Sequence, residues 1–207
     1  MKTPVCWLLL LLLFVSPFTL RAVEPVTILV LGDSLSAGYG LAESDAFPAQ
    51  LEAALVAQGH AVRVINAGIS GDTSAGGVAR LEWSLADNPD LVILALGAND
   101  ALRGLSPDQT RTNLATIITR LQQRQIKVLL AGMMAPRNMG ENYYNSFDKI
   151  YPELTQEFSV PLYPFFLEGV AGKPVLNLAD GIHPNVAGIR VMVEGIMPLV
   201  VEELSTF

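Results

Sequence analysis

The amino-acid sequence predicts a three-layer α/β/α sandwich built on an open, mostly parallel five-stranded sheet. Two features lead to this fold class. Short apolar runs rich in β-branched residues alternate with longer stretches in which apolar residues recur at helical spacing. Because alternating strands and helices form parallel strands joined by right-handed crossovers, helices should cover both faces of the sheet.

Four apolar runs have the composition of strands that are buried on both faces of a parallel sheet. A shorter run nearer the C-terminus is the fifth expected strand. In chain order, the expected strands cover residues 26–31, 61–65, 91–96, 126–131 and 160–163.

Three stretches between these strands place apolar residues on one helical face, and a last helix is expected over residues 185–203. Neither an internal repeat nor a low-complexity tract suggests a second domain, so we expect a single domain over residues 23–207. The apolar positions are Phe47, Leu51, Ala54 and Leu55 in the first stretch, Val78, Leu81 and Leu85 in the second, and Leu114, Ile117, Ile118 and Leu121 in the third.

The first 22 residues have the layout of a secretory signal peptide. Lys2 precedes an unbroken apolar run over residues 7–15, and Ser16-Pro17 ends that run. The run is about half the ~20 residues that a membrane-spanning helix needs, so we expect cleavage after Ala22 rather than stable membrane insertion. The mature protein should then be periplasmic or secreted.

Charge and cysteine content exclude several classes of partner and chemistry. Without Lys2 and Arg21, the 13 basic residues fall to 11 against 20 acidic residues, a formal charge of −9. Nucleic acid and anionic membranes are poor partners for such a surface. The only cysteine, Cys6, lies in the expected signal peptide, so the mature chain has neither a disulfide nor a thiol nucleophile.

Polar and glycine-containing segments follow three of the expected strands, at residues 32–34, 66–74 and 97–100. In open α/β sheets, the ligand site lies beyond the carboxyl ends of the strands. The three segments should therefore converge on one crevice. Ser34 in the first of them is either a nucleophile or a cap of the following helix.

His183 is the more informative of the two histidines, because His60 stands beside Gly59 in an expected turn. Asp180 precedes His183 by three residues, which allows its carboxylate to bind one imidazole nitrogen and leave the other free as a base. A capping aspartate beside a surface histidine explains these two residues equally well.

The Asn99 amide can donate a hydrogen bond to a developing oxyanion, and the Gly71 N–H could approach as closely because glycine lacks a Cβ. A simple turn is the alternative for residues 97–100. The sequence contains no Gly-Lys-Ser/Thr loop, no ligand cluster at metal spacing and no favoured carboxylate pair for glycosidase chemistry. We therefore expect no metal and no cofactor.

Taken together, these segments resemble the four blocks of the GDSL, or SGNH, hydrolases, which carry an invariant Ser, Gly, Asn and His. The resemblance spans the mature chain and is strongest to the exported bacterial subgroup of thioesterase I, lysophospholipase L1 and arylesterase. It implies a flavodoxin-like fold. The four blocks correspond to residues 32–36, 66–74, 97–100 and 180–184, and residues 136–143 and 161–166 are similar to further segments of the subgroup.

The resemblance also implies the roles of the site residues. Ser34 would be the nucleophile, His183 the base and Asp180 the partner that orients it. The oxyanion hole would consist of the Ser34 N–H, the Gly71 N–H and the Asn99 side chain. Gly71 is chosen over Gly68 because the glycine of the family follows the asparagine of its block by five residues.

We expect a monomeric serine esterase that hydrolyses small-molecule acyl esters and thioesters through an acyl-enzyme. The alternatives are a carbohydrate O-acetylesterase and a non-catalytic periplasmic ligand-binding protein. Residues 136–144 lack strong helical spacing, so we expect a loop that closes over acyl chains, with Met134, Pro136 and Tyr143 in contact with substrate.

Overall fold

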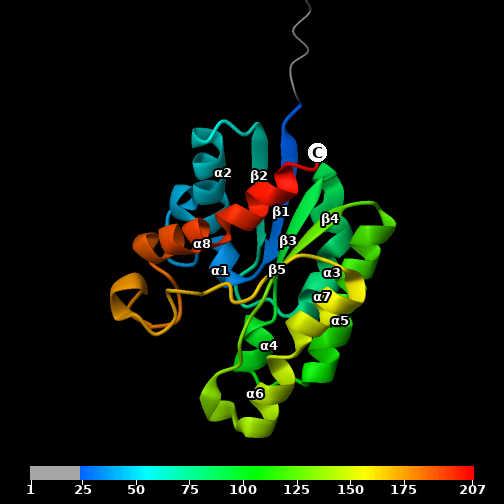
Figure 1. Ribbon diagram of the computed structural model, residues 1–207. Helices are drawn as coiled ribbons and strands as arrows, with labels where there is room; N and C mark the ends of the chain where they lie inside the picture. Colours follow the sequence, from blue (N-terminus) through cyan, green and yellow to red (C-terminus); the bar gives the residue numbers. More distant parts are fainter. Residues whose placement is uncertain (1–23) are drawn as a thin grey trace, which may run out of the picture.

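The computed structural model describes residues 24–207, so the expected signal peptide lies outside the described residues. Its centre is a sheet of five parallel strands in the order β2-β1-β3-β4-β5 (Figure 1). This order and the helices on both faces confirm the predicted fold class. The strands are β1 (Val26–Gly32), β2 (Val62–Gly68), β3 (Leu91–Ala95), β4 (Lys127–Ala131) and β5 (Leu162–Tyr163).

The strand order reverses at β1, because the chain runs from β1 to β2 on one side and then crosses to β3 on the other. In the register of the sheet, Gly32 pairs with both Gly68 and Ala95, so the carboxyl ends of these three strands lie level. Such a reversal leaves a crevice between the segments that leave the strands. The fold therefore prepares a site beyond the end of β1.

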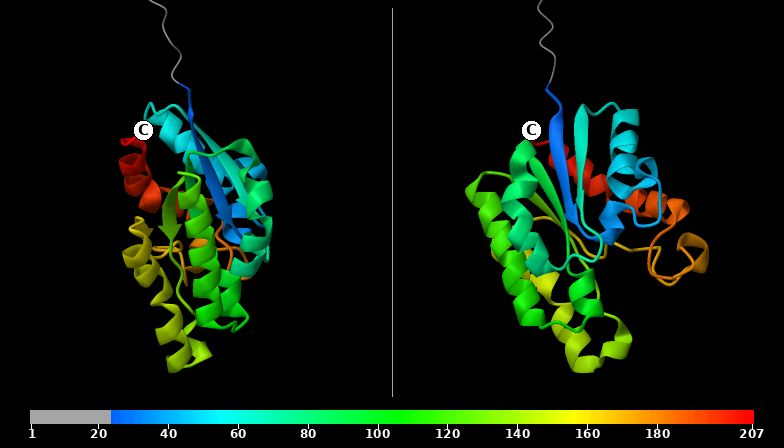
Figure 2. Two further views of the ribbon diagram at one scale, coloured as in Figure 1. Left: turned by 90° about the vertical axis from the view of Figure 1, so that its right-hand side faces the viewer. Right: turned by 180° about the vertical axis from the view of Figure 1, so that it is seen from behind.

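Two layers of helices enclose the sheet (Figure 2). Helices α2 and α8 pack against each other on one face, and α3, α5 and α7 form the other layer. The three helical stretches expected from apolar spacing are confirmed as α2, α3 and α5, and the expected last helix as α8. The bounds are α2 (Phe47–Ala57), α3 (Ser74–Ser84), α5 (Pro107–Gln123), α7 (Ile150–Phe158) and α8 (Val186–Leu204).

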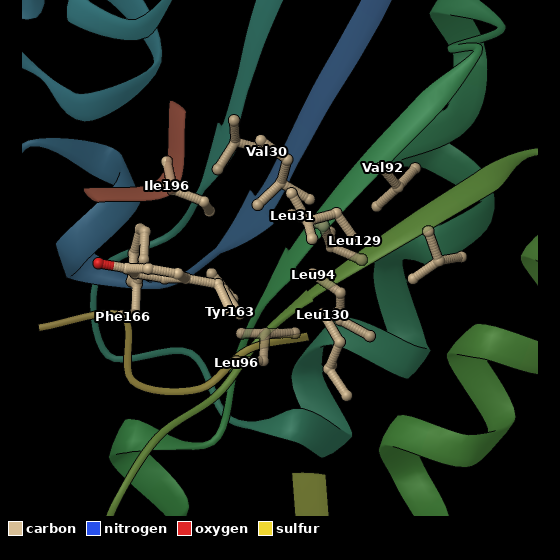
Figure 3. Packing of buried hydrophobic residues seen from close by; sticks show 14 of the residues in the cluster. Val30, Leu31, Val92, Leu94, Leu96, Leu129, Leu130, Tyr163, Phe166 and Ile196 are labelled. Carbon is tan, nitrogen blue, oxygen red and sulfur yellow. The ribbon is translucent and has the colours of Figure 1, made fainter. Parts of the chain in front are cut away.

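The hydrophobic core lies on both faces of the central strands. Every residue of β3 is buried, because the strand has a neighbour on each side and a helix layer on each face. Burying one such Leu or Ile side chain contributes roughly 1.5–3 kcal/mol. In Figure 3, strand residues pack with side chains from α8 and from the segment after β5; the labelled residues are Val30, Leu31, Val92, Leu94, Leu96, Leu129, Leu130, Tyr163, Phe166 and Ile196.

One expectation about the strands is wrong. The second strand was expected over residues 61–65 and buried on both faces, yet Ala61 and Arg63 are exposed and only Val62 of β2 is buried. β2 is an edge strand with a single neighbour, so its side chains pack against helices only in part. Composition alone does not separate an edge strand from a central one.

Short helices form where the sequence showed no helical period, because a few residues are too short to display one. Residues 136–144 are not an irregular loop: they contain a short 3₁₀ helix and most of α6. Among the described residues, no helix is both long enough and apolar enough to cross a bilayer. The short elements are α1 (Ser34–Ala37), α4 (Ala98–Leu102) and α6 (Glu141–Phe147), with 3₁₀ turns at Glu43–Asp45, Leu85–Asp87, Arg137–Met139 and Pro174–Leu176.

Candidate active site

Ser34 is the first residue of α1, directly beyond the end of β1 (Figure 1). Asp33 caps this short helix, since its carboxylate accepts the Leu35 N–H at 3.0 Å. A Cβ on Gly68 would lie 2.4 Å from the Ala37 nitrogen, so only glycine lets the end of β2 approach α1 this closely. The strand ends thus hold Ser34 at the base of the crevice.

His183 and Asp180 reach Ser34 from a tight hairpin before α8. The Ser34 Oγ lies 3.0 Å from His183 Nε2, and His183 Nδ1 lies 2.7 Å from Asp180 Oδ2. The Leu178 N–H donates to the His183 carbonyl at 2.7 Å. Asn185 then caps α8 through the N–H groups of the first turn. The structure therefore brings together three residues that are separated by up to 149 positions in the sequence.

The Asp180 carboxylate is held in its charged form. It accepts the backbone N–H groups of His183 and Ile182 as well as the imidazole, and these hydrogen bonds lower the pKa of Asp180 to about 2. An ionised carboxylate on Nδ1 keeps a proton on that nitrogen and leaves Nε2 free to accept the serine proton. This geometry suits a serine nucleophile with a histidine base.

Asn99 lies in α4, which follows β3 after Leu96 and Gly97, and it lines the same cavity as Ser34. Its Nδ2 donates to Asp33 Oδ2 at 3.2 Å. Asp33 is 1 % exposed, and this burial raises the pKa of its carboxyl group to about 6 despite the hydrogen bonds from Leu35 and Asn99. The sequence did not predict the link between Asp33 and Asn99.

Gly71 lies in the loop between β2 and α3 and has a φ of +83°, a conformation that favours glycine. The Arg103 guanidinium donates to the Gly71 carbonyl at 2.7 Å. Within residues 24–207, neither the Gly71 N–H nor the Ser34 N–H donates to a protein acceptor. Both backbone donors are therefore available to a ligand.

Arg80 connects this loop to the sheet, a role that was not expected from the sequence. Its guanidinium pairs with Asp72 at 2.6 Å and donates to the Ala67 and Gly32 carbonyls, each at 2.8 Å. The only signal in the sequence is that Arg80 is the single basic residue of α3. Arg80 links the ends of β1 and β2 with the residue that follows Gly71.

Asp100 joins three helices through hydrogen bonds that its sequence segment does not predict. It is 1 % exposed and accepts hydrogen bonds from the Ser74 N–H at 2.9 Å, from the Ser74 hydroxyl at 2.5 Å and from the Thr110 hydroxyl at 3.1 Å. These contacts join the starts of α3, α4 and α5. They fix the position of the loop that carries Gly71 relative to α4, which carries Asn99.

A cavity of about 430 Å³ opens beside Ser34. Met134 and Pro136, which were expected to bind substrate, both line it. Tyr143 does not: its hydroxyl donates to the Leu105 carbonyl at 2.8 Å, and its ring packs on Phe147. The lining is mostly apolar and comprises Ser34, Leu35, Ala98, Asn99, Ala101, Leu102, Met133, Met134, Ala135, Pro136, Arg137, Phe165, Leu167, Ala171, Ile182 and His183.

The Tyr39 ring lies against the His183 imidazole, with 4.3 Å between the ring centroids and a tilt of 31°.

In the described part of the chain, no group of three or more His, Cys, Asp or Glu side chains is arranged to hold a metal ion. The groups around Ser34 are thus a carboxylate, an imidazole, an amide and backbone N–H donors.

Comparison with known proteins identifies the family. Residues 30–191 match the GDSL-like lipase/acylhydrolase family. The chain is 44% identical over 173 residues to esterase TesA of Pseudomonas aeruginosa, covering 83% of this chain and 86% of the relative. It is 45% identical over 174 residues to thioesterase 1/protease 1/lysophospholipase L1 of Escherichia coli strain K12, covering 84% of this chain and 82% of the relative.

A solved structure agrees with these relatives. The crystal structure of the psychrotrophic esterase EstA from Pseudoalteromonas sp., inhibited by monoethylphosphonate, matches with a TM-score of 0.82 at 32% identity, covering 86% of this chain and 98% of that chain. The likeness therefore extends over most of the fold of this chain. The chain belongs to the GDSL-like lipase/acylhydrolase family.

Proposed function

We propose that this protein is a serine esterase that hydrolyses acyl esters and thioesters through an acyl-enzyme on Ser34. The observation that carries the proposal is the hydrogen-bonded series from the Ser34 hydroxyl through His183 to Asp180, with distances of 3.0 and 2.7 Å. A serine is a weak nucleophile unless a neighbouring base takes its proton. Here the base is in contact with the hydroxyl and is itself held by a carboxylate.

In the first step, the Ser34 Oγ bonds to the substrate carbonyl carbon while His183 Nε2 takes the hydroxyl proton. The negative charge on the carbonyl oxygen would be held by the Ser34 and Gly71 N–H groups and the Asn99 amide. His183 then gives its proton to the departing alcohol or thiol, which leaves an acyl-serine. A water molecule repeats the sequence, with His183 as its base, and releases the carboxylic acid and free Ser34.

The cavity supports an acyl group longer than acetyl. Its volume of about 430 Å³ and its lining by Met134, Pro136 and Phe165 suit an apolar chain beside Ser34. A carbohydrate O-acetylesterase would need little of this apolar space, and a non-catalytic binding protein would not need the base next to Ser34. The relatives are named as esterases, a thioesterase and a lysophospholipase, which supports a range of acyl substrates for this chain.

We also propose that the protein is exported through residues 1–22 and acts as a monomer in the periplasm or outside the cell. The order of Lys2, the apolar run and Ser16-Pro17 supports export. N-terminal sequencing of protein recovered from the periplasm or medium tests export, with a start at residue 23 as the expected result.

Analytical ultracentrifugation at the concentrations used for activity assays tests the monomeric state, with the mass of one chain as the expected result.

Replacing Ser34 tests the central proposal. Ser34→Ala should fold normally and lose nearly all turnover of p-nitrophenyl esters, acyl-CoAs and lysophospholipids, because the hydroxyl supplies chemistry rather than packing. Ser36→Ala is a matched control, since the Ser36 hydroxyl is buried in the same short helix without a hydrogen-bond partner. A fluorophosphonate should label the wild type and Ser36→Ala but not Ser34→Ala. Wild-type turnover in pure Ser34→Ala would refute the proposal.

A further inference from the structure

We propose that Asp33 is a positioning residue of the oxyanion hole: its carboxylate determines which end of the Asn99 carboxamide faces the substrate. This inference rests on the proposed function, because it assigns Asn99 to the oxyanion hole. It goes further by giving a chemical part to the residue that precedes the nucleophile.

The contacts of Asp33 occupy both of its oxygens. Oδ1 accepts the Leu35 N–H at 3.0 Å, and Oδ2 accepts one hydrogen of the Asn99 amide nitrogen at 3.2 Å. The second hydrogen of that nitrogen remains available, because Asn99 Nδ2 has no other protein acceptor among residues 24–207. One amide nitrogen can thus donate both to Asp33 and to a developing oxyanion.

A carboxylate can only accept hydrogen bonds, so it imposes one orientation on its neighbour. If the Asn99 carboxamide turned by 180°, its oxygen would face the Asp33 carboxylate and also the oxyanion. Both contacts would place two acceptors together in a buried place, which is costly. The charged form of Asp33 therefore keeps the Asn99 nitrogen, rather than its oxygen, toward the reacting carbonyl.

The protonated form of Asp33 lacks this preference. A neutral carboxyl group carries an O–H, which can donate to the Asn99 oxygen and stabilise the turned carboxamide. Burial raises the pKa of Asp33 to about 6, so this change falls close to neutral pH. The oxyanion hole would then lose its side-chain donor as the solution is acidified.

Several charged or titratable groups influence Asp33 from neighbouring elements. His183 before α8 favours the charged carboxylate and Asp72 after β2 opposes it. Tyr151 of α7 is also close enough to interact with Asp33, and Arg80 of α3 binds the adjacent Gly32 carbonyl. Protonation of Asp33 should therefore contribute to the fall in rate on the acid side of the pH profile.

A double-mutant cycle at positions 33 and 99 distinguishes a positioning role of Asp33 from a purely structural role. Asn99→Ala should lower kcat roughly 100- to 1000-fold with little change in KM, as expected for loss of one oxyanion donor. Asp33→Asn should cause a loss of at least similar size, because the neutral side chain no longer orients Asn99. The double variant should match Asn99→Ala within about threefold, since position 33 would act only through Asn99. Multiplying losses, or wild-type kcat in folded Asp33→Asn, would overturn the inference.

The pH profile gives a second test that needs no change at position 33. Below pH 6, kcat/KM of the wild type should fall more steeply with pH than that of Asn99→Ala, because protonation of Asp33 removes an oxyanion donor only where Asn99 is present. Equal slopes in the two proteins would overturn the inference.

The two proposals fail in different ways. Failure of the serine mechanism would appear as turnover in Ser34→Ala. If the Asp33 inference failed, Ser34→Ala would still be inactive, but the double-mutant cycle and the pH slopes would show that Asp33 and Asn99 act independently.

Discussion

The site contains two aspartates in opposite environments. Asp33 lies at the buried end of β1, where loss of water raises the pKa of its carboxyl group to about 6. Asp180 lies in the exposed hairpin before α8, where two backbone N–H groups and the imidazole lower its pKa to about 2. The same residue type thus has a variable charge near neutral pH in one region and a constant charge in the other. Local donors and burial, rather than residue type, decide which aspartate can be permanently ionised.

This difference in charge state fits the roles that we propose for Asp180, as the partner of His183, and for Asp33, as the residue that positions Asn99. The partner of a histidine base must stay charged while the imidazole gains and loses a proton. Asp180 meets that condition throughout the pH range in which most enzymes work. Asp33 does not, so its protonation can change the orientation of Asn99.

The largest effect on activity is expected from removing the negative charge of Asp180. Asp180→Asn should lower kcat by about 10⁴-fold, because an amide at position 180 can favour the wrong imidazole tautomer. Ester hydrolysis at pH 8 by folded protein measures this loss. Asp87→Asn is the control, since it removes an exposed carboxylate that precedes the amino end of β3, whereas the site lies beyond the carboxyl ends of the strands. A fall in kcat of less than tenfold in Asp180→Asn would show that the reaction does not need an ionised carboxylate at position 180.

The two aspartates should also have opposite effects on stability. The pKa of Asp33 rises on folding from 3.8 to about 6, so the folded state holds the proton more tightly and the free energy of unfolding falls as pH rises through this range. A shift of this size corresponds to about 3 kcal/mol. Relative to wild type, Asp33→Asn should gain about that much between pH 4 and pH 7.5, measured by urea denaturation at each pH.

The companion measurement concerns Asp180, whose pKa falls on folding. Its charge stabilises the folded state above pH 3.8, and this stabilisation disappears as pH falls through about 2. Asp180→Asn should therefore be less stable than wild type at neutral pH, with a difference that shrinks on acidification. If the Asp33→Asn difference did not change with pH, the contrast in charge state would be wrong.

The smallest effect is expected from a change in the cavity that alters neither Asp33 nor Asp180. Met134→Ala enlarges the cavity, so kcat/KM should fall about five- to tenfold for decanoyl esters and little for acetyl esters, given ~0.8 kcal/mol per buried methylene. The shape of the pH profile should not change. Met139→Ala is a matched control, because Met139 does not line the cavity. An equal loss on both ester lengths would indicate destabilisation rather than acyl binding.

Much of the fold follows from patterns within short segments. The alternation of apolar strands with helical stretches predicted the sheet and, through α2, α3, α5 and α8, both helix layers. Helix α7, with nine residues, was not predicted, and the short helices were missed because four to seven residues show no helical period. The edge position of β2 was missed as well, since strand order depends on which segments pair across the whole chain.

The candidate site divides in the same way. Ser34, Asp180, His183 and Asn99 stand in distinctive segments, and the structure brings all four to the end of β1 and β3. The sequence placed Tyr143 with Met134 and Pro136, but its side chain points to the Leu105 carbonyl instead. Loop sequence indicates which residues are near one another, whereas the direction of a side chain depends on the packing around it.

The sequence by itself determined the layers of the fold, the family and the residue types of the chemistry, because these depend on local apolar spacing and short motifs. Only the tertiary structure decided how Asp33 meets Asn99 across 66 positions, how Arg80 binds two strand ends and how the apolar cavity forms beside Ser34. The physical reason is that parallel pairing brings the ends of β1, β2 and β3 level. The burial and hydrogen bonding produced there set the charge of each aspartate.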